Sequence, residues 1–100
     1  MKAEQARIAI YNGSSASDLL DRTIGYLRDQ GANITASGNA DKAYTTTTII
    51  DHTSNPFTLK YLVDLMHIHP TRIYFAYDPN SPVDVEVFLG NDWSAQNPLP

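Results

Sequence analysis

The residues best suited to binding follow the first apolar stretch, where Tyr11 leads into the turn Asn12-Gly13-Ser14-Ser15. A turn of this type at a helix start presents free N–H groups at the positive end of the helix dipole, which suits an anion. It lacks the lysine and the further glycines of a phosphate-binding loop. Turn formation and helix capping are the main interpretation, and a ligand role for Asn12, Gly13 and Ser14 is the alternative.

Three histidines, His52, His67 and His69, raise the question of a metal site, because neutral imidazole is a common metal ligand. A helix would turn His67 and His69 away from each other, so they can share an ion only if the chain unwinds before Pro70. No carboxylate has a recognised ligand spacing beside them. We therefore expect histidines at the surface or at helix ends, no metal site and no cofactor.

Two further groups of residues could support catalysis. Asp51 and His52 could act with a serine, but no serine lies in the strained strand-to-helix turn that a nucleophile of this kind needs. Asp84 and Glu86 alternate along a predicted strand and share a face, which we expect to be solvated rather than catalytic. No catalytic residue is assigned, and we do not expect an enzyme.

Three aromatic residues, Tyr11, Tyr74 and Phe88, are expected on the outward face of a sheet. Tyr11 and Phe88 face outward because the aliphatic residues that alternate with them are expected in the core. Tyr74 joins them if Ile73, Phe75 and Tyr77 are core residues. Such rings stack on sugars or pack against another protein, although aromatic residues also pair across strands for stability alone.

The first unit of the chain is predicted to be a strand, a tight turn and an amphipathic helix. Apolar residues alternate over 7–11, and the Asn-Gly turn tolerates positive φ where that strand ends. Ser15 and Asp18 have the spacing of a capping box, which places the helix start near Ala16. Gly31 suits the left-handed residue that ends a helix.

The remaining elements are predicted in the order strand, strand, helix, strand, strand. They cover 33–35, 44–51, 56–68, 72–77 and 83–89, separated by polar loops at 37–41 and 78–82. The whole order is β-α-β-β-α-β-β. It predicts an α/β (α+β) two-layer sandwich with a mixed sheet of about five strands and two helices.

One hundred residues are enough for one domain, which we place at 7–93. Residues 1–6 are expected to be a disordered or added N-terminal segment, and 94–100 a flexible tail. The net charge of −4 with only seven scattered basic residues predicts no nucleic-acid partner. There is no cysteine, no apolar run long enough to span a membrane and no signal peptide, so the chain is cytoplasmic or, as we prefer, part of a longer protein.

Five stretches together resemble the LytR C-terminal domain of LytR-CpsA-Psr cell-envelope proteins. They are the strand ending in Asn12-Gly13-Ser14, the helix leading to Leu27 and Gly31, the Asn39-Ala40 loop, Thr47 or Thr48 before Ile49 and Ile50, and the closing segment from Val85 to Asp92. The resemblance runs from about residue 7 to 92. One departure is that Asp18 and Leu19 stand among the usually small residues that follow the turn.

The resemblance implies an extracytoplasmic module of a longer, membrane-anchored cell-envelope protein. In that family the module often follows a domain that transfers phosphate-linked glycopolymers to peptidoglycan, and no such domain is present in these residues. The module itself is implied to be a non-catalytic accessory that binds cell-wall polymer or an envelope protein, with no membrane contact of its own. The alternative is a protein-protein interaction or homodimerisation module without a polymer ligand. A small metal-dependent or serine enzyme is a third hypothesis.

Overall fold

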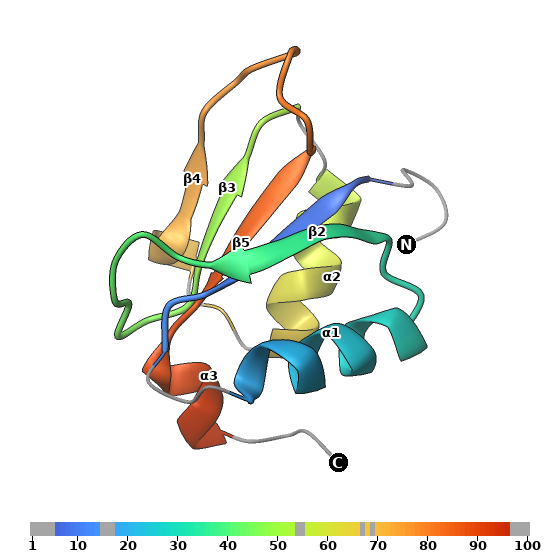
Figure 1. Cartoon of the computed structure of the whole chain (residues 1–100). Helices are drawn as coiled ribbons and strands as arrows, with labels where there is room; N and C mark the ends of the chain where they lie inside the picture. Colours follow the sequence, from blue (N-terminus) through green and yellow to red (C-terminus); the bar gives the residue numbers. More distant parts are fainter. Residues whose placement is uncertain (1–5, 15–17, 54–55, 67, 69, 97–100) are drawn as a thin grey trace.

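The structure is a computed structural model that describes residues 6–14, 18–53, 56–66, 68 and 70–96. Its strands and helices appear in Figure 1. In chain order they are β1 (Ile8–Asn12), α1 (Leu19–Asp29), β2 (Ile34–Asn39), β3 (Thr48–Asp51), α2 (Pro56–Met66), the short 3-10 helix η1 (Pro70–Arg72), β4 (Ile73–Phe75), β5 (Val85–Leu89) and α3 (Asn91–Gln96). The predicted fold class is confirmed, with one short helix added at the end.

The five strands form one mixed sheet in the order β2-β1-β5-β3-β4. Strand β1 pairs in parallel with both of its neighbours, β2 and β5. Strand β3 runs antiparallel to β5 and parallel to β4. The register places Tyr11 beside Phe88 and Ile50 beside Tyr74. Residues from opposite ends of the sequence therefore meet on one face.

Helices α1 and α2 pack on one face of the sheet and leave the other face, here called the open face, without a covering helix in the described part of the chain (Figure 1). The core between the layers contains aliphatic residues of both helices and of four strands. These include Ile8, Ile10, Leu19, Leu27, Ile34, Ile49, Leu59, Leu62, Met66, Val85, Val87 and Leu89. The alternation in β5 is as predicted, with Val85, Val87 and Leu89 buried and Phe88 on the open face.

Helix α1 begins at Leu19, three residues later than the predicted start near Ala16. Asp18 occupies the N-cap position but makes no capping hydrogen bond with its side chain, so its part of the predicted capping box is wrong. Ser15 and Ala16 lie outside the described residues. The predicted end is confirmed, because Gly31 follows the helix with φ of 94°.

Strand β2 extends through the segment that we predicted as a loop. Ser37 and Asn39 pair with residues of β1, and this pairing with a buried central strand overrides the small, polar composition. Strand β3 is shorter than predicted and begins at Thr48. The threonines before it instead contact the start of α3, as described below.

Strand β4 has three residues and lies at the edge of the sheet. The outward position of Tyr74 was predicted on the condition that Ile73, Phe75 and Tyr77 are core residues, but Phe75 and Tyr77 are 72% and 76% exposed. Alternation predicts which face a side chain shares, whereas burial also needs an element packed on that face. No described helix covers this edge, so the condition is not met for these two residues.

Helix α3 was not predicted, and its last three residues fall in the segment expected to be a flexible tail. Trp93 anchors the helix, because its side chain is fully buried and its Nε1 donates a 2.8 Å hydrogen bond to Thr23 Oγ1 of α1. The ring also lies beside Tyr26. Trp93 thus attaches a helix of six residues to the core, together with the hydrogen bonds of Asn91 and Asp92 that are described below.

Among the described residues, no helix has both the length and the hydropathy that crossing a membrane requires.

Candidate binding face

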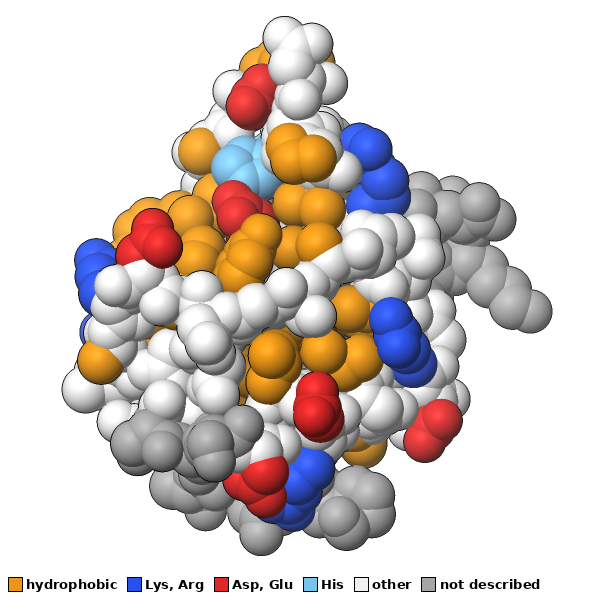
Figure 2. All heavy atoms as spheres, viewed as in Figure 1, with side chains coloured by type: hydrophobic (Ala, Val, Ile, Leu, Met, Phe, Trp, Pro, Cys, Tyr) orange, Lys and Arg blue, Asp and Glu red, His pale blue; other side chains and the backbone are white. Residues whose placement is uncertain are grey.

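Three aromatic rings form a continuous stack on the open face, here called the aromatic row. The rings of Tyr11 and Phe88 have centroids 5.3 Å apart, and those of Phe88 and Tyr44 are 5.2 Å apart. Tyr11 comes from β1, Phe88 from β5 and Tyr44 from the segment after β2. Apolar side chains gather over the middle of this face in Figure 2. The predicted outward position of Tyr11 and Phe88 is therefore observed.

Two glycines make room for the row. Gly38 pairs with Tyr11 across β1 and β2, and a Cβ at Gly38 would lie 3.8 Å from the Tyr11 ring, in ordinary contact. Gly13 is more restrictive, because a Cβ there would lie 2.5 Å from Cδ1 of Tyr44. The Tyr44 ring can approach the sheet this closely because Gly13 carries no side chain, whereas Gly38 would tolerate a Cβ.

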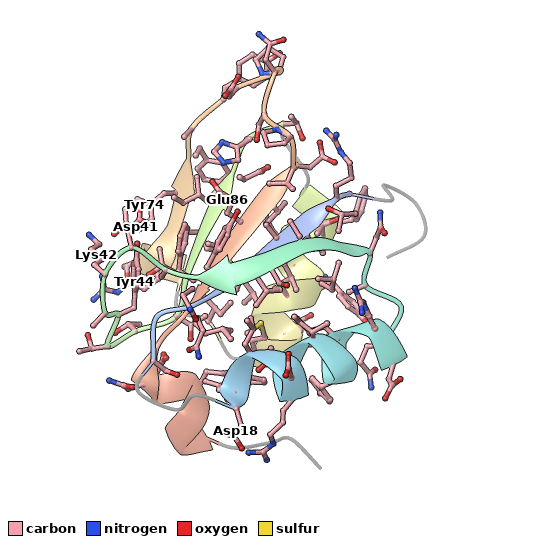
Figure 3. All side chains as sticks on the ribbon, viewed as in Figure 1. Asp18, Asp41, Lys42, Tyr44, Tyr74 and Glu86 are labelled. Atoms are coloured by element: carbon pink, nitrogen blue, oxygen red, sulfur yellow. The ribbon has the colours of Figure 1, made fainter. Side chains whose placement is uncertain are left out.

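Hollows lie on both sides of the aromatic row. The Tyr11 hollow has a volume of about 260 Å³ and is lined by Tyr11, Asn39, Ala40, Asp41, Glu86 and Phe88. The Tyr74 hollow has a volume of about 370 Å³ and is lined by Lys42, Ala43, Tyr44, Thr45, Thr46, Thr48, Ile50, Arg72 and Tyr74. Figure 3 shows Asp41, Lys42, Tyr44 and Tyr74 close together at one side of the sheet. The segment from residue 39 to 46 thus contributes to both hollows.

The two hollows differ in charge. The Tyr11 hollow contains the carboxylates of Asp41 and Glu86, whereas the Tyr74 hollow contains the cationic side chains of Lys42 and Arg72 and no acidic residue. Lys42 Nζ lies 5.4 Å from the centre of the Tyr44 ring, within the range of a cation–π contact. Acidic side chains therefore line one hollow and basic side chains the other.

His52 joins the open face to the chain that follows β4. Its Nε2 lies 2.6 Å from Oε1 of Glu86, and its Nδ1 lies 2.8 Å from the carbonyl oxygen of Ala76. A carbonyl and a carboxylate both accept hydrogen bonds, so the protonated ring, with two N–H groups, satisfies both. Burial opposes the charge, but the hydrogen bonds to Glu86 and Ala76 outweigh it and raise the pKa of His52.

The phenol of Tyr11 keeps its proton over a wide pH range. Burial, followed by the negative charges of Glu86 and Asp41, raises its pKa above the ordinary value. The hydroxyl therefore stays neutral and can donate a hydrogen bond to the neighbouring Glu86 at the edge of the Tyr11 hollow.

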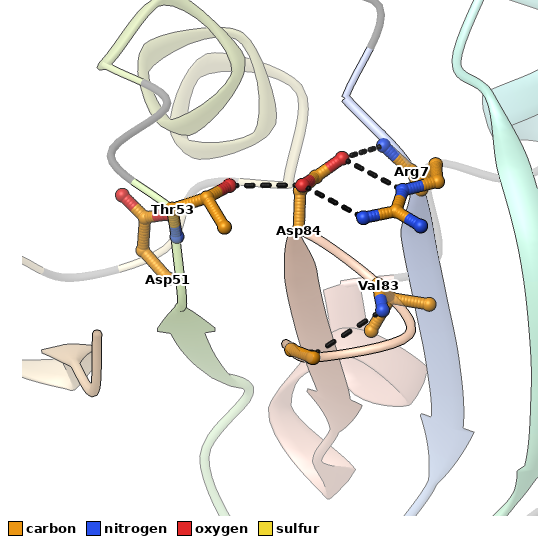
Figure 4. A network of polar contacts seen from close by, with 6 residues as sticks. Arg7, Asp51, Thr53, Val83 and Asp84 are labelled. Atoms are coloured by element: carbon orange, nitrogen blue, oxygen red, sulfur yellow. Dashed lines mark hydrogen bonds and ion pairs between the residues drawn. The ribbon is translucent and has the colours of Figure 1, made fainter. Parts of the chain in front are cut away.

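The carboxylates of Asp84 and Glu86 do not form a pair, and they are not solvated as predicted. Their side chains are only 18% and 25% exposed, and each has its own partner. Asp84 accepts hydrogen bonds from the backbone N–H and guanidinium of Arg7 and from the hydroxyl of Thr53 (Figure 4). The Arg7 side chain is the main reason that the pKa of Asp84 falls to about 2.

The turn after β1 is held by bonds within the protein. Oδ1 of Asn12 accepts hydrogen bonds from the backbone N–H and the hydroxyl of Ser14, at 3.0 and 2.7 Å. The N–H of Gly13 donates to the carbonyl of Leu89, and its own carbonyl accepts from Tyr44. Gly13 does not have the positive φ that we expected, and its requirement for glycine is spatial.

This turn also borders a third, more open hollow of about 300 Å³, which Asn12, Gly13 and Ser14 line together with residues 40–43. Helix α1 begins five residues after Ser14, so these residues do not form the first turn of the helix. The structure thus places the turn near the aromatic row, where it supports Tyr44. A ligand role for Asn12, Gly13 and Ser14 stays a prediction.

The described residues do not support the hypothesis of a histidine metal site or that of a serine nucleophile acting with Asp51 and His52. The ring nitrogens of His52 face Glu86 and Ala76, while His67 and His69 lie outside the described residues. Within the described ranges, no group of three potential metal ligands comes together.

A buried network fixes the segment that carries Tyr44. Oδ1 of Asp92 accepts 2.8 Å hydrogen bonds from the N–H and the hydroxyl of Thr47, and Thr47 Oγ1 accepts one from the N–H of Gly90. Backbone N–H groups of Asn91 and Asp92 bind the carbonyls of Tyr44 and Thr45. The threonine run, which composition alone assigned to a strand, thus serves to anchor the loop.

Sequence reasoning missed several residues of the candidate face, among them Lys42, Tyr44, Ile50 and Arg72. Ile50 lies two positions from Thr48 on a predicted strand, so the two share a face, but the threonine run does not show which face is open. The position of the other three depends on a loop and on the 3-10 helix η1, for which the sequence carries no periodic signal.

The comparisons with known proteins agree with this architecture. The family model described as "LytR cell envelope-related transcriptional attenuator" matches residues 5–93. The fold is similar to that of the soluble domain of a conserved hypothetical secreted protein from Mycobacterium marinum, with a TM-score of 0.63 and 17% sequence identity. The match covers 87% of this chain and 60% of that domain. No curated protein matches the chain.

A mixed five-stranded sheet covered by helices on one face defines the class of domain, and the family match then places the sequence within that class. The chain belongs to the LytR C-terminal family, which confirms the resemblance inferred from the five stretches. Four of those stretches meet around Tyr44: the Asn-Gly-Ser turn, the Asn39-Ala40 segment, the threonines and the segment closing at Asp92.

Proposed function

We propose that this chain is a non-catalytic, extracytoplasmic accessory module of a cell-envelope protein and that its open face binds cell-wall polymer. The cell-envelope description of the family and the secreted protein that shares the fold support the location. The parent protein is longer and membrane-anchored in this proposal, as the resemblance implies.

The observation that carries the binding proposal is the aromatic row between two hollows. Aromatic faces stack on the C–H faces of sugar rings, and polar groups beside them hydrogen-bond to hydroxyls. Tyr74, which is 48% exposed, adds a ring beyond the stack of Tyr11, Phe88 and Tyr44. A linear polymer lying across the sheet would meet these rings in succession.

Retention of the purified domain on peptidoglycan sacculi tests the proposal. Tyr74→Ala removes an exposed ring, so we expect the fold to be kept and the bound fraction to fall about fivefold, the effect of losing roughly 1 kcal/mol of stacking. Phe88→Leu interrupts the aromatic row and should lower retention as well.

Phe57→Ala is the matched control, because Phe57 is 69% exposed and lies on α2, away from the open face. Its retention should equal that of the unmodified chain. The proposal is wrong if the unmodified chain is not retained, or if the control loses as much binding as Tyr74→Ala.

A protein partner or a second copy of the chain is the second candidate, and one observation favours it. Phe75 and Tyr77 lie at or just after the edge strand β4, and each exposes more than two thirds of its surface. Exposed edges and apolar patches of this kind commonly pair with another chain. Sedimentation of the domain at tens of micromolar separates the cases, since a monomer excludes homodimerisation as its main role.

A further inference from the structure

The Tyr74 hollow has a defined chemical character. Tyr44 and Tyr74 stand at its sides, Ile50 and Thr48 supply strand residues of the sheet, and Lys42 and Arg72 bring positive charge. Ile50 and Tyr74 are partners in the register of β3 and β4, so the isoleucine lies directly beside the tyrosine. Aromatic, aliphatic, hydroxyl and cationic groups thus line one volume of about 370 Å³, within the ~300–1,000 Å³ typical of small-ligand sites.

The charge of this hollow is unusual for the chain. The protein has a net charge of −4, yet two of its seven basic residues line a hollow that contains no acidic side chain. In the part of the chain that the structure describes, neither Lys42 nor Arg72 forms an ion pair with a carboxylate. Two cations that line the same hollow repel each other, and a bound anion would relieve that repulsion.

From this combination we infer that the Tyr74 hollow binds a sugar ring that carries a negative group, either a carboxylate or a phosphate. This inference rests on the proposed function and names the chemistry of its ligand. The rings of Tyr44 and Tyr74 contact the faces of the sugar, while Lys42 and Arg72 bind the anionic group.

The Tyr11 hollow suits the same group less well, because the carboxylates of Asp41 and Glu86 line it, although Glu86 is paired with His52. A charged polymer is therefore bound with its anionic ring on the Tyr74 side of the aromatic row. The different charges of the two hollows therefore determine which way round a charged polymer lies on the open face.

The test measures binding of four small probes to the intact domain at low salt by calorimetry. Trigalacturonate carries carboxylates on its rings, glucose 6-phosphate carries a phosphate, maltotriose is neutral, and inorganic phosphate has no ring. At least one charged sugar should bind five- to tenfold more tightly than maltotriose and than inorganic phosphate. The charged sugar that binds more tightly identifies the anionic group.

Variants then assign the binding to the hollow. Lys42→Gln and Arg72→Gln should each weaken the charged sugar about fivefold and leave maltotriose unchanged, while Tyr74→Ala should weaken both sugars. Lys60→Gln, at an exposed position of α2, removes the same charge elsewhere and should have no effect. The melting temperature of each variant checks that the fold is kept, and Lys42, which is exposed, remains informative if the Arg72 variant unfolds.

Three results would overturn the inference: equal binding of maltotriose, binding of inorganic phosphate as tight as that of the sugars, or no binding of any probe. Sacculi retention separates this failure from failure of the proposed function. Retention that depends on Tyr74 but not on Lys42 or Arg72 contradicts the anionic ligand and leaves polymer binding intact. Binding of charged sugars without retention on sacculi contradicts the wall polymer and leaves the anionic site.

Discussion

Two glycines decide how closely the Tyr44 segment approaches the sheet. A Cβ at Gly13 would lie 2.5 Å from Tyr44 Cδ1 and 2.9 Å from the carbonyl oxygen of Leu89, and one at Gly90 would lie 2.5 Å from the backbone of Thr46. Neither glycine needs positive φ, so both are required for space alone. The geometry of the candidate face thus depends on two residues that have no side chain.

Gly13→Ala should therefore disturb both stability and binding. We expect the free energy of unfolding to fall by about 2 kcal/mol, because the backbone of Leu89 cannot move away as a flexible side chain could. Gly25→Ala is the control: Gly25 is exposed within α1, with nothing within 4 Å of the added Cβ, and the change should raise stability by ~0.5–1 kcal/mol. Urea denaturation measures the free energy of unfolding of the two variants. A Gly13 variant as stable as the unmodified chain would show that the Tyr44 ring does not lie against Gly13.

At the scale of residues, part of the candidate face could be predicted from the sequence. Tyr11 and Phe88 were predicted to face outward because both lie on strands with clear alternation. Tyr44 could not be predicted, since it lies in a loop whose course depends on hydrogen bonds to residues 90–92. Local patterns cannot show contacts between segments so far apart in the chain.

At the scale of elements, Asp84 links the start of β5 to the chain before β1 and after β3. It binds Arg7 through backbone and side chain and accepts a hydrogen bond from Thr53, as Figure 4 shows. The pKa of its carboxyl falls from 3.8 to about 2, chiefly because of the Arg7 side chain. A lowered pKa means that the folded state favours the ionised carboxylate, which stabilises the fold above pH 4.

Asp84→Asn should lower the free energy of unfolding by about 1 kcal/mol at pH 7, a value that allows for solvent screening of the half-exposed Arg7. The difference from the unmodified chain should shrink as the pH falls from 4 towards 2, because the carboxyl becomes protonated. Denaturation curves at several pH values measure this. A difference that stays constant down to pH 2 would contradict the ion pair.

The attachment of α3 gives a second prediction about elements. Thr23→Val keeps the shape of the side chain but leaves the buried Nε1–H of Trp93 without its acceptor, which should cost about 1–3 kcal/mol of stability. Thr35→Val, at an exposed position of β2, should change stability by less than about 0.5 kcal/mol. Equal stability of the two variants would show that the hydrogen bond does not hold α3.

The elements themselves were mostly predictable. Long periodic segments gave both main helices and the central strands, since apolar alternation and helical spacing are strong local signals. Two errors concern the edges: β2 extends further than expected, and Phe75 is exposed on β4. Trp93 escaped prediction as an anchor because a helix of six residues is too short to show a recognisable period.

At the scale of the whole molecule, the two faces of the sheet have different roles. Helices α1 and α2 bury one face and provide the core, while the open face carries the aromatic row and two hollows of opposite charge. Membership of the LytR C-terminal family places this arrangement in a group described as cell-envelope-related. Fold class and family were predictable from sequence, whereas the charge difference across the face required the three-dimensional contacts.

The central claim is that the open face binds polymer, and backbone NMR of the ¹⁵N-labelled domain tests it most directly. Soluble glycan strands released from sacculi are titrated in, and amide shifts are followed across the chain. We predict saturable shifts at Tyr11, Tyr44, Tyr74 and Phe88 and none along Leu19–Asp29 of α1. An absence of shifts at saturating glycan, or shifts confined to α1 and α2, would contradict binding at the open face.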